Sequence, residues 1–259
     1  MQFVEVNGRI LCYEYSDRGM DRTFVFLNSL GTDFRIWNSV TSSLRAFGNV
    51  LCFDNRGHGL SDVVPGKTTV RDMADDAYSL IQMLVSGNVV IVGLSVGGMM
   101  AQVLAGLLPE RIEKLVLCDT RHKIGNADIW NERIDTVSRH GLEKIADGVM
   151  SRWFSESFRS AFPEQVQGYR NMLLRTPVPG YIATCEAIRD GDLTTQASSI
   201  RIPTICIVGS EDQSTPVEEV RSLASLIPGS QFEIIENAGH IPCVDSPGAL
   251  VKLIKEFVA

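Results

Sequence analysis

The segment 88–101 constrains the fold of this chain more than any other stretch. It reads NVVIVGLSVGGMMA, so an apolar β-branched run leads into Gly-x-Ser-x-Gly and then into a helix-forming tail. In a strand–turn–helix of this kind the serine occupies a sharp, strained turn and its hydroxyl projects from the edge of a sheet. The pattern predicts Ser95 as a nucleophile and the backbone N–H of Val96 as an oxyanion donor. A glycine-rich connection without catalysis has the same pattern, so the rest of the chain must supply an acid, a base and a second donor.

Predicted strands alternate with predicted helices along the chain. Apolar runs predict strands at 23–27, 50–53, 88–92, 114–118, 204–208 and 231–235, and an Asn-Gly pair predicts an antiparallel hairpin between 3–6 and 9–13. We therefore expect an α/β fold with a mostly parallel sheet and helices on both faces. Capping boxes predict helix starts at Thr69, with Asp72, and at Thr215, with Pro216 at the first helical position and Glu218.

The pattern changes between residues 122 and 199. This stretch contains amphipathic segments broken by glycine and proline, and none of them is a convincing strand. The sequence predicts a core formed by 1–121 and 200–259, with 122–199 as a helical cap, or lid, inserted between two strands.

Composition excludes several classes of function. The 259-residue chain has a net charge of −7, which argues against binding to nucleic acid or to anionic membranes. Its six cysteines show no C-x-x-C spacing and several lie in apolar runs, as expected for buried, reduced thiols. No signal peptide or membrane span is recognisable, so we expect a soluble, cytoplasmic protein. The oligomeric state is not predicted.

Three residues at the ends of predicted strands suggest catalysis. Ser95, Asp212 and His240 all lie where parallel strands present their carboxyl ends, the edge at which open α/β sheets bind ligands. A serine hydroxyl needs a base that is neutral near pH 7, and a carboxylate orients that base and stabilises its charged form. Asp119, at the end of another strand, competes with Asp212 for the role of the acid. We interpret His58 as a structural residue of its glycine-rich turn rather than as a second base.

These motifs resemble the α/β-hydrolase superfamily over essentially the whole chain. The resemblance rests on the serine turn, on Asp54–Ser61 (DNRGHGLS), on Gly209–Asp212 (GSED) and on Gly239–His240. Within the superfamily, Leu27–Asp33 (LNSLGTD), Gly93–Met99 (GLSVGGM), Lys123–Gly125 and Trp130–Ile134 (WNERI) are similar to the 3-oxoadipate enol-lactonases of aromatic degradation. Alignment with the superfamily motif assigns the second oxyanion donor to the amide of Leu30.

The resemblance implies a serine hydrolase that opens an enol-lactone and needs neither a cofactor nor a metal. Such a small anionic lactone requires a cationic partner, because burial of an unpaired carboxylate is prohibitive. We expect Arg133 to bind that carboxylate and Trp130, three residues earlier on the same helix face, to cover the ring; Arg121 and Arg139 are the alternatives. A general carboxylesterase, a C–C bond hydrolase and a ligand receptor that retains the triad remain alternative functions.

Overall fold

Residues 1–63 and 66–259 fold around one eight-stranded sheet. These are the residues that the computed structural model describes. Among them the strand order is β1-β2-β4-β3-β5-β6-β7-β8. The pairs β1–β2 and β2–β4 are antiparallel, and all other neighbouring pairs are parallel. The strands are β1 (Gln2–Val6), β2 (Arg9–Ser16), β3 (Arg22–Leu27), β4 (Asn49–Phe53), β5 (Asn88–Leu94), β6 (Ile112–Cys118), β7 (Thr204–Gly209) and β8 (Gln231–Ile235). The mostly parallel sheet that the sequence predicted is confirmed.

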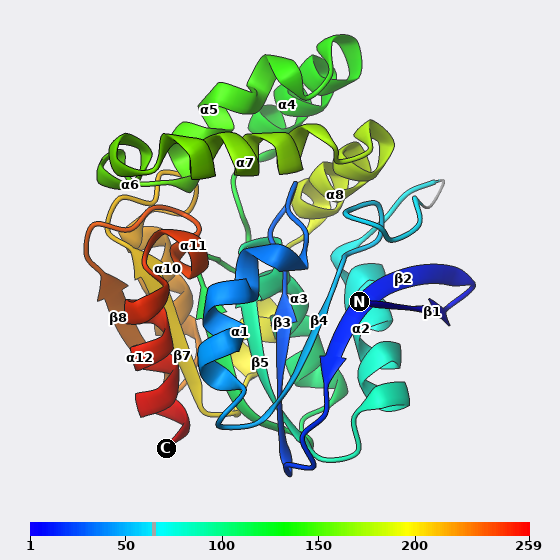
Figure 1. Ribbon diagram of the computed structural model, residues 1–259, viewed down its shortest axis with the longest axis vertical. Coiled ribbons are helices and arrows are strands. Elements are labelled where there is room, and N and C mark those ends of the chain that lie inside the picture. Colours follow the sequence, from blue (N-terminus) through cyan, green and yellow to red (C-terminus); the bar gives the residue numbers. More distant parts are fainter. Residues whose placement is uncertain (64–65) are drawn as a thin grey trace.

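Helices cover both faces of this sheet (Figure 1). The helices are η1, a 3₁₀ helix (Phe34–Trp37), α1 (Asn38–Leu44), α2 (Val70–Leu84), α3 (Val96–Leu107), α4 (Ala127–His140), α5 (Glu143–Trp153), α6 (Glu156–Ala161), α7 (Pro163–Leu174), α8 (Val178–Asp190), α9 (Thr194–Ser199), α10 (Val217–Leu226), α11 (Pro242–Asp245) and α12 (Pro247–Val258). On one face α1 packs against α12. On the other, α2 packs against α3, and α9 bridges α3 and α10.

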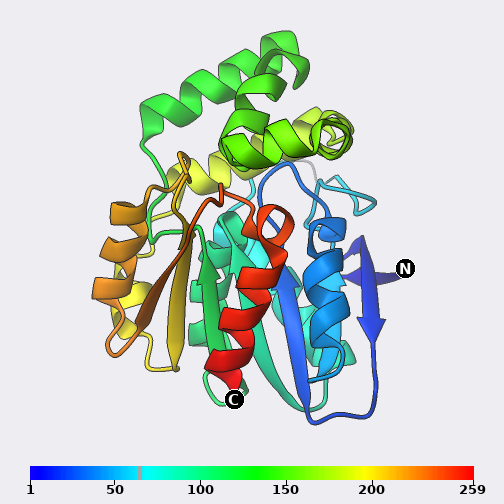
Figure 2. The same cartoon turned by 60° about the vertical axis from the view of Figure 1, so that its left-hand side comes forward.

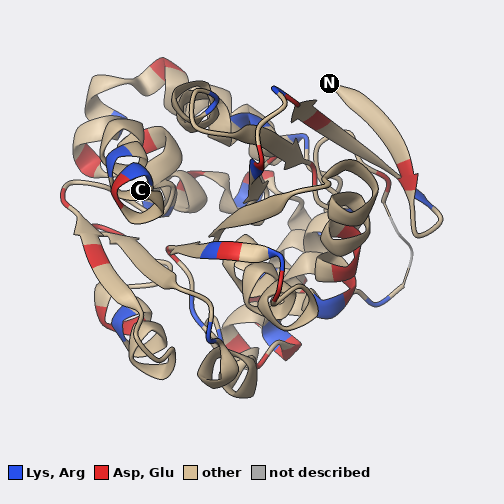
Figure 3. Ribbon diagram, turned by 90° about the horizontal axis from the view of Figure 1, so that it is seen from below, with Lys and Arg blue, Asp and Glu red and all other residues tan. Residues whose placement is uncertain are grey.

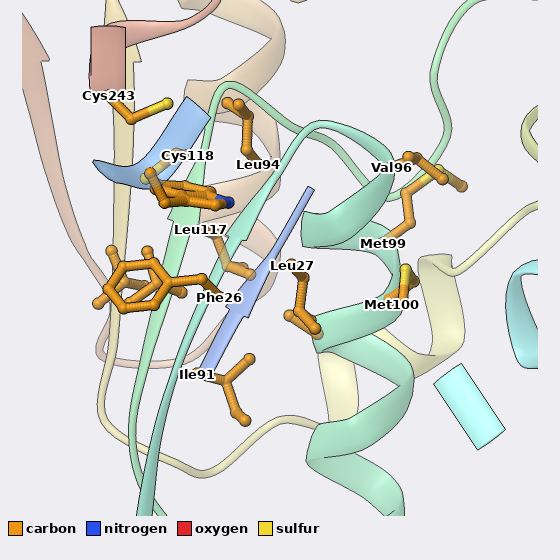
Figure 4. Packing of buried hydrophobic residues seen from close by; sticks show 14 of the residues in the cluster. Phe26, Leu27, Ile91, Leu94, Val96, Met99, Met100, Leu117, Cys118 and Cys243 are labelled. Carbon is orange, nitrogen blue, oxygen red and sulfur yellow. The ribbon is translucent and has the colours of Figure 1, made fainter. Parts of the chain in front are cut away.

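The strands form where the sequence supplies runs of apolar, mostly β-branched residues, which suit a buried, pleated surface. Alternate side chains of one strand reach opposite faces of the sheet. Figure 4 shows this for β3, where Leu27 lies on the side of α3 and Phe26 on the opposite side. All six cysteines are buried and free, and Cys118 and Cys243 lie on the side of Phe26.

The segment between β6 and β7 forms only helices, as the sequence predicted. Its helices α4 to α8 lie above the carboxyl ends of the parallel strands (Figure 1, Figure 2). α9 instead contacts α3 and α10 beside the sheet. We keep the name cap segment for residues 122–199, and its division from the core as a separate unit remains a proposal.

One of the two predicted helix starts is correct. Thr69 and Asp72 form a reciprocal capping box at the start of α2. The prediction for Thr215 is wrong: α10 begins at Val217 with Pro216 as its N-cap and no side-chain cap. The Thr215 hydroxyl instead donates to Oδ2 of Asp212, 2.6 Å away, so a contact within the candidate site replaces the expected helix cap.

Charges of both signs are interspersed over the ribbon rather than gathered by sign (Figure 3). Among the described residues, no helix is both long and apolar enough to span a bilayer.

Candidate active site

Ser95 lies in a strained turn between β5 and α3. Its φ of 57° and ψ of −119° are unusual for a residue with a side chain. Hydrogen bonds hold this backbone on both sides: its N–H donates to the carbonyl of Cys118 (3.0 Å), and its carbonyl accepts from the Thr120 hydroxyl (2.6 Å). A Cβ on Gly97 would stand 2.2 Å from the Leu27 carbonyl oxygen, so only glycine lets α3 start this close to β3.

Asp212 and His240 form a hydrogen-bonded pair at the ends of β7 and β8. Nδ1 of His240 lies 2.8 Å from Oδ2 of Asp212, and both side chains are buried. Oδ1 of Asp212 accepts from the amides of Ser214 (2.7 Å) and Thr215 (3.1 Å). Burial acts to raise the pKa of Asp212, but the charge of His240 and these hydrogen bonds outweigh it and hold the pKa below its usual range. The carboxylate is therefore charged and oriented toward the imidazole.

Ser95 and His240 line one cavity of about 230 Å³ beneath the cap segment. Ser29 and Leu30, which follow β3, line it as well. Among the hydrogen bonds of residues 1–63 and 66–259, neither the Leu30 amide nor the Val96 amide donates to a protein acceptor. Within the described part of the chain, the two predicted oxyanion donors therefore have no protein partner.

His58 holds the loop that carries Leu30. Its Nε2 accepts from the Gly31 amide at 3.0 Å, which assigns the proton to Nδ1, 3.2 Å from the carbonyl oxygen of Arg56. Complete burial lowers the pKa of His58 to about 4, so the ring is neutral at pH 7. The geometry fits the structural interpretation of His58 rather than a second base.

Asp119 ends β6 but does not take the hydrogen bond of His240. One carboxylate oxygen of Asp119 accepts from the Gly209 amide (2.9 Å), and the side chain is completely buried. Ligand atoms of Asp119, Asp212 and His240 lie within 4.8 Å of one another, an arrangement that could also hold a metal ion. Hydrogen bonds from Ser214, Thr215 and His240 already converge on Asp212, and this donor set fits an acid–base pair.

Trp130 and Arg133 of α4 both line the cavity. The Arg133 guanidinium lies 5.4 Å from the centroid of the Trp130 ring, and its Nη1 is 3.4 Å from the hydroxyl of Tyr181. The two alternatives lie elsewhere: Arg121 pairs with Glu219, and Arg139, on the same helix, pairs with Asp135.

Arg152 is a cavity residue that the sequence analysis missed. It lies near the end of α5 and lines the cavity, which has no aspartate or glutamate among its described lining residues. Within the part of the chain that the structure describes, neither Arg133 nor Arg152 has a carboxylate within 4.0 Å. The adjacent Trp153 indicates that this helix has an apolar face, but no local sequence pattern shows that the face turns toward the cavity.

Known proteins of similar sequence and structure share this architecture. A model of the alpha/beta hydrolase family matches residues 24–253. A 3-oxoadipate enol-lactonase of Acinetobacter baylyi is 33% identical over 225 residues, which cover 87% of this chain and 84% of that protein. The crystal structure of the enol-lactonase from Burkholderia xenovorans superposes with a TM-score of 0.95 at 31% identity, covering 99% of both chains. A malate-bound thermophilic esterase from Thermogutta terrifontis matches with a TM-score of 0.90 at 30% identity, covering 100% of this chain and 98% of the other.

Proposed function

The chain belongs to the alpha/beta hydrolase family, and from that premise we propose that it is a serine hydrolase that opens an anionic enol-lactone, of the 3-oxoadipate enol-lactone type, to a 3-oxo dicarboxylic acid. The family establishes a hydrolase. The lactone substrate and the roles of individual residues are the proposal.

In this mechanism His240 removes the proton from the Ser95 hydroxyl, which attacks the ring carbonyl carbon. Asp212 fixes the tautomer of His240 and stabilises the imidazolium, and the amides of Leu30 and Val96 bind the oxyanion. Collapse of the tetrahedral intermediate breaks the bond to the ring oxygen, and the imidazolium of His240 gives that oxygen the proton taken from Ser95. The resulting enol tautomerises to the ketone, and His240 is neutral again. His240 then activates a water that hydrolyses the acyl-enzyme, and Ser95 regains its proton.

The charge of the cavity carries the choice of substrate. Ser95 and His240 share the cavity with two arginines and, among its described lining residues, with no acidic side chain. In a protein of net charge −7 this is a local cationic site. A lactone with a free carboxylate supplies the missing partner: Arg133 and Arg152 bind the carboxylate, and Trp130 covers the ring.

An esterase of small anionic esters is the second candidate. The Thermogutta esterase, which was crystallised with the dicarboxylate malate, favours it. Both candidates need the same serine and the same cationic cavity, so only the leaving group separates them. The six buried, free thiols support a reducing compartment, and we place the enzyme in the cytoplasm.

The decisive experiment compares substrates on the purified protein and on Ser95→Ala. We expect kcat/KM to be highest for the anionic enol-lactone, lower for a saturated lactone with the same carboxylate, and lowest for neutral esters. Ser95→Ala should lower kcat by at least about 10⁴-fold, because it removes the nucleophile. Thermal unfolding should stay unchanged, because the substitution removes only one small hydroxyl group. Faster turnover of open-chain anionic esters would favour the esterase, and an acyl adduct located by mass spectrometry on another residue would remove Ser95 from its role.

A further inference from the structure

Asp119 is a buried acid for which the proposed mechanism has no use. It follows β6 with a φ of 46° and is 0% exposed. Its Oδ1 accepts from the Gly209 amide at 2.9 Å. Its Oδ2 is equally buried and has no hydrogen-bond partner among the described residues. A buried, unpaired carboxylate oxygen is costly, so its protonation state requires an explanation.

Several titratable groups face Asp119. Asp212 and His240 lie on the loops after β7 and β8. A carboxylate oxygen of Asp212 and a ring nitrogen of His240 each lie within 4.8 Å of a carboxylate oxygen of Asp119. The charge of Asp245 of α11 also raises the pKa of Asp119. Cys243 of α11 and Cys118 of β6 lie near enough for Asp119 to raise the pKa of both thiols, and neither of them carries a positive charge. Asp245 has its own donors, the amides of Ser155 (2.8 Å) and Gly239 (2.7 Å). His240 is thus the one basic side chain within this described group, and its hydrogen bond goes to Asp212.

Two adjacent buried carboxyl groups do not both ionise, because their like charges repel in a medium of low dielectric constant. The hydrogen bonds decide which group holds the charge. Asp212 accepts from two amides, one hydroxyl and one imidazole, whereas Asp119 accepts from one amide. Burial, followed by the charge of Asp212, raises the pKa of Asp119 well above its ordinary range. The negative charge therefore lies on Asp212 and the proton on Asp119.

We propose that Asp119 is a positioning residue that stays protonated during turnover and donates an O–H···O hydrogen bond from its Oδ2 to the carboxylate of Asp212. The inference rests on the proposed role of Asp212 as the partner of His240. Asp119 keeps its proton throughout the reaction, so the proton balance of the mechanism is unchanged. The bond gives the unpaired Oδ2 a partner and adds a further restraint to the carboxylate that orients the base.

Asp119→Asn tests this directly, because an amide keeps a donor but cannot ionise. The Gly209 amide orients the replacement, since it requires an acceptor at Oδ1 and so directs the new NH₂ group toward Asp212. Asparagine also tolerates positive φ. Asp119→Ala removes the donor, and we expect it to lower kcat by about 10- to 100-fold with little change in KM. Asp119→Asn should recover most of that loss. If Asp119→Ala does not fold, Asp119→Gly removes the same donor and accepts the positive φ.

The pH profile separates a donor from a merely structural carboxylate. If Asp119 is neutral in the wild type, Asp119→Asn removes no charge and the acidic limb of kcat/KM stays in place. If Asp119 is an anion, its removal disfavours the imidazolium and moves that limb down by about 1–3 pH units. An infrared band of a protonated carboxylic acid should be present in the wild type at neutral pH and absent from Asp119→Asn.

A shifted acidic limb, a missing carboxylic acid band, or an Asp119→Asn variant as slow as Asp119→Ala would overturn the proposal. A near-normal Asp119→Ala enzyme would overturn it as well. The comparison can use 4-nitrophenyl acetate, provided that Ser95→Ala abolishes its hydrolysis. The result for Asp119 therefore does not depend on the identity of the natural lactone, and failure to turn over enol-lactones counts only against the proposed substrate.

Discussion

At the scale of single residues, side-chain hydrogen bonds that converge on Asp212 define the site, and one of them spans 28 residues of sequence. His240 reaches Asp212 over 2.8 Å, and the same carboxylate accepts from the Thr215 hydroxyl at 2.6 Å. Strand ends predicted Asp212 and His240, because both side chains follow apolar runs at one edge of the sheet. Helix-capping rules do not predict that Thr215 bonds to Asp212, three residues earlier in the same loop, instead of capping α10. No local pattern predicts that Asp119 faces a second carboxyl group, because that depends on packing between the separate segments after β6 and β7.

Asp212→Asn tests the orientation of the base. The amide places an N–H where His240 Nδ1 needs an acceptor, so the imidazole turns to the wrong tautomer or loses its partner. We expect kcat to fall by about 10³–10⁴-fold with the fold intact. The matched control is Asp119→Asn, the same substitution on the neighbouring strand end. A crippled Asp119→Asn beside a nearly normal Asp212→Asn would transfer the role of the acid to Asp119.

At the scale of elements, the core was easier to predict than the cap segment. The core strands were located within two or three residues of their ends, because each carries its own apolar run between turn residues. The four-residue α11 was missed, since so short a helix has no periodicity to detect. The spacing of Trp130 and Arg133 predicted that they share a face of α4. The orientation of α5, which brings Arg152 to the cavity, is set by packing with α4 and α7 and has no local signature.

The helices α4 and α5 each contribute one arginine to the cavity, and Arg133→Met and Arg152→Met test what they bind. A charge-assisted contact contributes roughly 1.5–3 kcal/mol, so each change should lower kcat/KM for an anionic lactone by about 10- to 150-fold. A neutral ester should lose much less. Arg139→Met is the control, because Arg139 lies on α4 but is 69% exposed and pairs with Asp135. Equal losses on charged and neutral substrates would mean that the arginines support the cap segment instead.

At the scale of the whole molecule, hydrogen bonds tie the cap segment to the core beside the cavity. The amide of Ile241 donates to the carbonyl of Trp153 (3.0 Å), and the Thr176 hydroxyl donates to the carbonyl of Gly31 (3.4 Å). The amide of the same Gly31 donates a hydrogen bond to Nε2 of His58. The loop after β3 is therefore fixed from the core by His58 and from the cap segment by Thr176, so the protonation state of one histidine affects the stability of the assembled structure.

Acidification should therefore destabilise the protein through His58. Burial lowers the folded-state pKa of His58 from 6.5 to about 4. The folded state is therefore favoured by His58 above pH 6.5, and this contribution to stability is lost as the pH falls toward 4. The reason is that His58 binds a proton at a higher pH in the unfolded chain than in the folded protein. Between about pH 7 and about pH 4.5 this amounts to about 2–3 kcal/mol of the free energy of unfolding. The protonated ring also cannot accept from the Gly31 amide, so we expect the loop after β3 to loosen over the same pH range.

His58→Gln isolates this effect, because its amide oxygen can accept from Gly31 but does not titrate there. We expect the variant to be less stable than the wild type by about 1–3 kcal/mol near pH 7, owing to imperfect replacement of two buried hydrogen bonds. The difference in the free energy of unfolding between the two proteins should shrink as the pH falls, because only the wild type loses the stability that neutral His58 contributes. Urea unfolding at both pH values measures it, with His140→Gln on the exposed face of α4 as the control. A stability gap that stays constant from neutral to acidic pH would show that His58 does not couple proton binding to folding.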